Sequence, residues 1–145
     1  MQLVVLGLNH RSAAVEVRER FSFEKNEVES ALNRLYEYEK ISECVILSTC
    51  NRTEIYAVLE DVQSPKAYML DVLKHLKHAD TIDESAFFFY EEKACIEHLF
   101  RVSASLDSLV LGEGQILSQL KGAYIAAYSA GFTGTVFNIL FQRAI

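Results

Sequence analysis

Cys50 is the first residue that could do chemistry, because it lies where an apolar run gives way to polar residues in LSTCNRTEIY. A free cysteine has a pKa near about 8.5, so it is mostly a thiol at neutral pH unless a neighbour stabilises the thiolate. Alternate side chains of a strand share a face, which predicts that Cys50, Arg52 and Glu54 point the same way. Arg52 could then stabilise a thiolate or pair with a substrate carboxylate, while Glu54 could hold Arg52 or bind an ammonium group. The alternative is a cysteine packed as a small apolar side chain beside a surface ion pair.

His98 is the first candidate for proton transfer. It lies between apolar residues in IEHLFR, on a segment whose periodicity predicts a helix. A histidine beside a thiol can act as its acid or base, whereas a histidine in an apolar setting often satisfies a structural hydrogen bond. His10, just after the first predicted strand, is a competing candidate for the same role.

A third polar group lies in SLVLGEGQIL. Gly112 and Gly114 before a predicted helix resemble the opening of a dinucleotide fingerprint, but a leucine occupies the third glycine position and no strand follows the helix. We therefore expect a loop that places Ser108, Glu113 and Gln115 at a helix N-terminus, where a carboxylate ligand is favoured. An ordinary interhelical turn is the alternative.

Composition excludes several classes of protein. Cys44, Cys50 and Cys95 lack CxxC spacing and the histidines lack a metal-binding spacing, so we expect reduced thiols in the cytoplasm and no metal site. A net charge of −6 argues against binding nucleic acid by bulk electrostatics, although a local patch could still contact RNA. No run approaches the roughly 18 apolar residues of a membrane span, and the start of the chain lacks a basic leader.

The elements that must position these residues follow from hydrophobic periodicity. Two of the strands are separated by a few residues around Asn51, which predicts a hairpin. The order βαββαβ predicts one α+β domain over residues 1–145, a ferredoxin-like sheet with helices on one face, followed by additional C-terminal helices. The last helix ends without a cap, so we expect the chain to come from a longer protein. Strands are predicted at 3–7, 44–49, 53–60 and 86–91, and helices at 21–40 (with Ser22 as N-cap), 64–76, 94–106, 114–131 and 135–145.

Three segments together resemble one known family. GLNHRSAAVEVRE, LSTCNRTEIY and HLFRVSASLDSLVLGEGQIL are similar, in this order, to the signature stretches of glutamyl-tRNA reductases, and GTVFNILFQRA continues the similarity. The resemblance implies the catalytic domain of an enzyme that reduces the glutamyl ester of charged tRNA to glutamate-1-semialdehyde with NADPH, at the start of tetrapyrrole and 5-aminolevulinate synthesis.

The resemblance also implies roles for residues. Cys50 would attack the activated ester to form a thioester, which hydride then releases as the aldehyde, and His98 would assist proton transfer or orientation. Glu54 would have a supporting role. The residues implied to bind the substrate are Thr49, Asn51, Arg52, Ser108, Glu113, Gly114, Gln115 and Gln119.

The expected cofactor and partners come from the same family. NADPH is expected in a Rossmann domain, and homodimer formation in a helical region, neither of which we find in these 145 residues. We therefore expect this fragment alone to be unable to complete the reduction. Glutamyl-tRNA and the downstream semialdehyde aminotransferase are the expected partners, with no membrane.

Two departures from the family and two alternative functions remain. Ala14 stands where the family commonly has proline, and Ser105 where it commonly has glycine. The first alternative is a cysteine-dependent acyl-transfer or hydrolase domain without a reductive partner. The second is a non-catalytic, ferredoxin-like RNA- or ligand-binding module in which Cys50 is structural.

Overall fold

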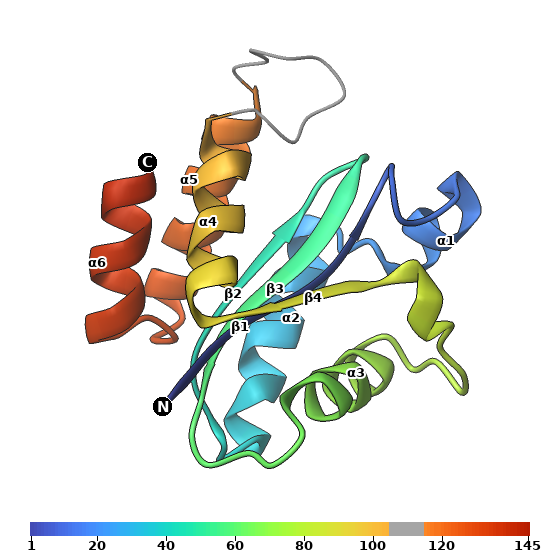
Figure 1. Cartoon of the computed structure of the whole chain (residues 1–145), viewed down its shortest axis with the longest axis horizontal. Helices are drawn as coiled ribbons and strands as arrows, with labels where there is room; N and C mark the ends of the chain where they lie inside the picture. The colour runs from blue at the N-terminus through green and yellow to red at the C-terminus, as the bar shows by residue number, and fades with distance from the viewer. Residues whose placement is uncertain (105–114) are drawn as a thin grey trace.

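The structure is a computed structural model that describes residues 1–104 and 115–145. Its strands and helices alternate along the first two-thirds of the chain, and helices alone follow (Figure 1). The strands are β1 (Gln2–Asn9), β2 (Ile41–Ser48), β3 (Arg52–Leu59) and β4 (Phe88–Glu91). The α-helices are α1 (Val15–Phe21), α2 (Lys25–Arg34), α3 (Pro65–Leu76), α4 (Glu92–Ser103), α5 (Gln115–Ser129) and α6 (Thr135–Ala144), with short 3-10 turns η1 (Leu35–Glu37) and η2 (Glu84–Ala86).

The four strands of the described residues form one antiparallel sheet in the order β2-β3-β1-β4. β3 pairs with β1 on one side and with β2 on the other, so β1 and β2 run in the same direction with β3 between them. The predicted hairpin around Asn51 is confirmed, since β2 and β3 are joined by three residues. The chain is therefore a mixed α/β protein built on an antiparallel sheet.

The sheet has a hydrophobic core on each face. Strand alternation sends Leu6 to the core beneath α2 and α3, and Val5 to the core beneath α4, α5 and α6. β3 is buried along its whole length, as expected for a strand covered on both faces. The helices predicted on one face of the sheet are thus α2 and α3, and the additional C-terminal helices α4, α5 and α6 cover the opposite face (Figure 1).

The predicted range 21–40 does contain a helix, α2, but the predicted start is wrong, because the chain breaks between α1 and α2. Ser22 does not cap the second helix: it ends α1, and its hydroxyl donates to the carbonyl of Glu19 at 3.0 Å. Glu24 caps α2 instead, in a reciprocal capping box with Glu27. Phe21 and Phe23 are both buried in the same core. Residues two apart on a helix point in nearly opposite directions, so burying both requires the break.

Gly7 does not end the first strand, as the sequence pattern predicted, but lies inside β1. It stands opposite Glu54 of β3 and Phe88 of β4. A Cβ atom at this position would lie 2.7 Å from Cζ of Phe88 and 2.8 Å from the carbonyl oxygen of Thr53. The glycine therefore leaves room for the side chains of both neighbouring strands.

α6 is attached to the sheet through a buried carboxylate of β2. Oε1 of Glu43 accepts hydrogen bonds from the backbone N–H groups of Gly134 at 2.6 Å and Phe137 at 2.8 Å. Oε2 accepts a weaker one from Val136 at 3.3 Å. The first N–H groups of a helix have no partner within the helix, so Glu43 supplies the cap that the local sequence lacks.

Candidate functional site

Cys50 lies exposed in the tight turn between β2 and β3. Thr49 fixes this turn, since its Oγ1 accepts hydrogen bonds from the N–H groups of Asn51 at 3.1 Å and Arg52 at 3.2 Å. The backbone N–H of Thr49 donates to the carbonyl of Arg52 at 2.8 Å. The expectation that Cys50 shares a strand face with Arg52 and Glu54 is wrong, because β3 begins at Arg52 and the thiol belongs to the turn.

The turn borders a cavity of about 680 Å³. His10 and Arg18 line it with Cys50, so an imidazole and a guanidinium group lie around the same space as the thiol. Nε of Arg18 is buried and has no hydrogen-bond partner among the described residues. The cavity is lined by His10, Val15, Arg18, Glu19, Ser22, Thr49, Cys50 and Asn51.

The other two cysteines are buried in the cores. Cys44 and Cys95 are both fully inaccessible to solvent. Burial raises the pKa of each thiol to about 12, so both stay protonated at neutral pH. Cys50 is therefore the accessible thiol of the three.

A buried polar network begins two residues after the thiol. Oε2 of Glu54 lies 2.7 Å from Nη1 of Arg52 and 2.8 Å from Nε2 of His98. The hydroxyl of Tyr56 donates to Oε1 of Glu54 at 2.6 Å. Arg52, Glu54 and Tyr56 alternate along β3 and so share the face that packs under α4, which carries His98. The predicted Arg52–Glu54 pair is present, and the same alternation could have identified Tyr56 as a further member.

Glu54 is ionised at neutral pH although it is fully buried. Burial alone would raise its pKa, but the interactions with His98 and Arg52 and the hydrogen bond from Tyr56 outweigh burial and lower the pKa. An ionised carboxylate only accepts hydrogen bonds, so Nε2 of His98 is the donor in the contact with Glu54.

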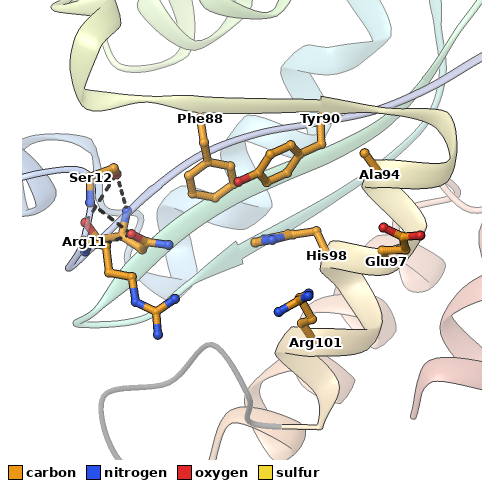
Figure 2. A pocket seen from close by; sticks show the side chains of 9 residues that line it. Arg11, Ser12, Phe88, Tyr90, Ala94, Glu97, His98 and Arg101 are labelled. Carbon is orange, nitrogen blue, oxygen red and sulfur yellow. Dashed lines mark hydrogen bonds between the residues drawn. The ribbon is translucent and has the colours of Figure 1, made fainter.

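His98 lines a second cavity, of about 450 Å³, between β4 and α4 (Figure 2). Its ring lies against Phe88, with 4.9 Å between centroids, and against Tyr90, with 5.1 Å. Cys50 does not line this cavity and His98 does not line the one at Cys50. The histidine that shares a cavity with the thiol is His10.

The remaining predicted residues are only partly brought together. Thr49 and Asn51 line the cavity of Cys50. Gln115 is exposed at the start of α5, and Gln119 lines a different cavity, between α2 and α5. Ser108, Glu113 and Gly114 lie outside the described residues, as does Ser105, while Ala14 is the uncharged N-cap position of α1.

Residues 1–104 and 115–145 hold neither a cluster of metal ligands nor a helix that could span a membrane. In this part of the chain no three histidine, cysteine or acidic side chains gather as metal ligands would. The helices of residues 1–104 and 115–145 are each too short or too polar to cross a membrane.

Comparison with known proteins identifies the family. The family model described as glutamyl-tRNA(Glu) reductase, N-terminal domain, matches residues 6–145. The chain is 42% identical to the glutamyl-tRNA reductases of Bacillus pumilus and Bacillus subtilis, over 100% of its own length and 32% of theirs. A solved structure of glutamyl-tRNA reductase from Methanopyrus kandleri matches with a TM-score of 0.77 and 33% identity, covering 98% of this chain and 32% of that one. The chain thus spans about a third of the length of these relatives, and it belongs to the family of glutamyl-tRNA reductase N-terminal domains.

Proposed function

We propose that this chain is the acyl-accepting domain of a glutamyl-tRNA reductase, with Cys50 as the nucleophile. Sγ of Cys50 attacks the ester carbonyl carbon of glutamyl-tRNA. The new C–S bond forms as the C–O bond to the terminal ribose breaks, and the thiol proton passes to the departing ribose hydroxyl. The observation that carries this proposal is the exposed Cys50 in a cavity with Arg18 and His10, while the other two thiols are buried.

The groups around the thiol have roles that suit such a step. Arg18 places a guanidinium group in the same cavity, and His10 is the imidazole available there to accept the thiol proton. Thr49 holds the turn through its hydroxyl, and Asn51 offers its side-chain amide to the substrate. The family resemblance adds Ser108, Glu113, Gly114, Gln115 and Gln119 to the substrate site.

Arg52 and His98 form one unit with Glu54 in this proposal. Arg52 is 2% exposed and its charge is balanced by Glu54, so the guanidinium is held in one orientation. His98 lies on the far side of Glu54 and lines another cavity. We assign His98 to positioning: it holds Glu54, which holds Arg52 at the start of β3, directly after the cysteine turn.

The fold and the cofactor complete the proposal. The strand order, with β3 between the parallel β1 and β2, and the packing of α2 and α3 on one face support the ferredoxin-like βαββαβ arrangement.

The described residues do not fit NADPH as a Rossmann site would, because their sheet is antiparallel. We propose that NADPH binds elsewhere in a longer, cytoplasmic, homodimeric protein that delivers its product to an aminotransferase, and we derive no hydride step from these residues.

The test is to trap the acyl intermediate. Glutamyl-tRNA labelled in the glutamyl group is mixed with the protein and quenched in acid, and protein-bound label is counted before and after treatment with hydroxylamine, which cleaves thioesters. We expect hydroxylamine-sensitive label on the wild type and on the control Cys95→Ala, and none on Cys50→Ser. Absence of label on the wild type would refute the proposal.

The two alternative functions give different results in the same experiment. A hydrolase would release free glutamate in a Cys50-dependent manner without holding label. A non-catalytic RNA module would bind the tRNA and leave its ester intact in the wild type and in Cys50→Ser alike.

A further inference from the structure

The acyl transfer proposed above places no group of the substrate in the cavity between β4 and α4. Its volume of about 450 Å³ lies within the range of about 300–1,000 Å³ that is typical of ligand sites. Figure 2 shows the rings of Phe88 and Tyr90 side by side along β4, with His98 facing them from α4. The guanidinium groups of Arg11 and Arg101 lie on the side of the cavity away from the two rings.

The rings of Phe88 and Tyr90 form an aromatic surface on which a planar group can stack. The rings of Phe88 and Tyr90 are stacked, with 5.3 Å between centroids and 26° between planes. Tyr90 keeps 37% of its surface exposed although its ring contacts two other rings, so part of it stays accessible to a ligand. Unpaired bases of RNA are commonly bound by stacking on such aromatic side chains.

The opposite wall is suited to phosphate. Arginine binds phosphate through paired N–H groups, and Arg11 and Arg101 approach the cavity from the loop after β1 and from the last turn of α4. Glu97 also lines the cavity, but its carboxylate lies 3.9 Å from the ammonium of Lys93, which lies outside the cavity. The charge of Lys93 therefore offsets part of the negative charge of Glu97. A chain with a net charge of −6 can thus hold an anionic ligand at this one local patch.

This cavity adjoins the cavity of Cys50. His10 lines the cysteine cavity, and its direct neighbours Asn9 and Arg11 line the aromatic one, so the two cavities lie on either side of a single loop. Asn9 also pairs with Arg52, the first residue of β3 after the cysteine turn. Consecutive Cα atoms are about 3.8 Å apart, so the residues that line the two cavities are close neighbours along this loop.

We propose that the aromatic cavity binds the nucleotide at the 3′ end of the charged tRNA, while the ester attached to that nucleotide reaches Cys50. The base stacks on Tyr90 and Phe88, and a backbone phosphate pairs with Arg11 and Arg101. The inference rests on the proposed function, because it assigns the nucleotide subsite for the same substrate.

The test measures RNA binding apart from chemistry. The probe is an uncharged RNA hairpin that copies a tRNA acceptor stem with an unpaired 3′ end, compared with the same hairpin lacking its last nucleotide. Affinity is measured by fluorescence anisotropy for the wild type, Tyr90→Ala, Tyr90→Phe and Arg101→Gln. Lys66→Gln is the control, since it removes one positive charge at an exposed position of α3 that does not line the cavity.

The expected results separate stacking from charge. Loss of one stacking contact should weaken binding of the complete hairpin roughly five-fold or more in Tyr90→Ala, whereas Tyr90→Phe should bind as the wild type does. Arg101→Gln should weaken binding and reduce the dependence on salt concentration, with a slope lower by about 0.7, while Lys66→Gln changes neither. For the shortened hairpin, Tyr90→Ala and the wild type should bind equally.

Other outcomes overturn the inference. If Tyr90→Ala weakens both hairpins equally, or neither, the cavity does not bind the terminal nucleotide. If NADPH displaces the hairpin from the wild type and binds less well to Tyr90→Ala, the cavity belongs to a free dinucleotide instead. Thioester trapping on the wild type is scored separately, so a missing thioester with intact nucleotide-dependent binding would count against the acyl-transfer proposal alone.

Discussion

Nε2 of His98 lies 2.8 Å from Oε2 of Glu54, so the middle of α4 is tied to the middle of β3 by a buried, charged hydrogen bond. The same carboxylate oxygen lies 2.7 Å from Nη1 of Arg52. Removing one partner of such a buried group leaves an uncompensated charge, whereas an exposed pair is screened by water. The same contacts therefore stabilise the domain and fix the orientation of Arg52, which directly follows the cysteine turn.

We expect Glu54→Gln to lower the free energy of unfolding by about 3–5 kcal/mol at pH 7, because Arg52 stays buried without a carboxylate. The folded state lowers the pKa of Glu54 from its ordinary value of 4.5. Its ionisation thus stabilises the fold above about pH 4.5, and this contribution is lost as the pH falls through the lower folded pKa. The difference between Glu54→Gln and the wild type should narrow below pH 4.5 in urea unfolding followed by circular dichroism.

A surface variant gives the control for this measurement. Glu97→Gln removes a carboxylate whose partner Lys93 is 91% exposed, so its unfolding free energy should stay close to that of the wild type. A Glu54→Gln difference that stays constant from pH 8 to pH 3 would contradict the role of the ionised carboxylate.

Cysteine labelling should distinguish the three thiols. In the native protein at pH 8, iodoacetamide should modify Cys50, while Cys44 and Cys95 stay unmodified because their pKa values are raised to about 12 and neither is accessible. In concentrated urea all three should react. Peptide mass spectrometry reports each site, and rapid native labelling of Cys95 would show that the core beneath α4 is open.

Local patterns in the sequence were enough for some of this architecture. The hairpin at Asn51 follows from the short separation of two strands, and the pairing of Arg52 with Glu54 follows from strand alternation. Both depend only on neighbours along the chain. The cavity shared by His10 and Cys50 could not be predicted in this way, because it forms between segments 40 residues apart. Cys50 was placed on the strand face because the alternation was extended two residues too far, into a turn fixed by Thr49.

The cap of α6 illustrates the same limit, and it gives a further prediction. No residue next to Gly134 supplies a side-chain cap, and the partner, Glu43, lies some 90 residues earlier in the chain. Glu43→Gln would place an amide N–H₂ group against backbone donors, so we expect a loss of about 1–3 kcal/mol in the free energy of unfolding. Native-state hydrogen exchange should become faster in the first turn of α6.

The control for Glu43 is the same change at Glu39, which is exposed. Glu39→Gln should leave exchange in α6 unchanged. If Glu43→Gln also leaves it unchanged, the helix is held by packing of Phe137 and Phe141 alone, and the carboxylate is not its cap.

Gly7 offers the sharpest test of how β1 shapes the region around His98. Gly7→Ala would bring a methyl group to 2.8 Å from the backbone oxygen of Thr53, which cannot move without disturbing the β1–β3 ladder. The methyl would also lie 2.9 Å from Cγ of Glu54. We expect the free energy of unfolding, measured in urea, to fall by about 1–3 kcal/mol, as is typical of overpacking. Equal stability of Gly7→Ala and the wild type would show that Phe88 and Glu54 have room to shift, so that a glycine is not required at this position.

Gly122→Ala inside α5 should have the opposite effect. Nothing lies within 4 Å of the Cβ position there, so the free energy of unfolding should rise by about 0.5–1 kcal/mol because alanine has the higher helix propensity.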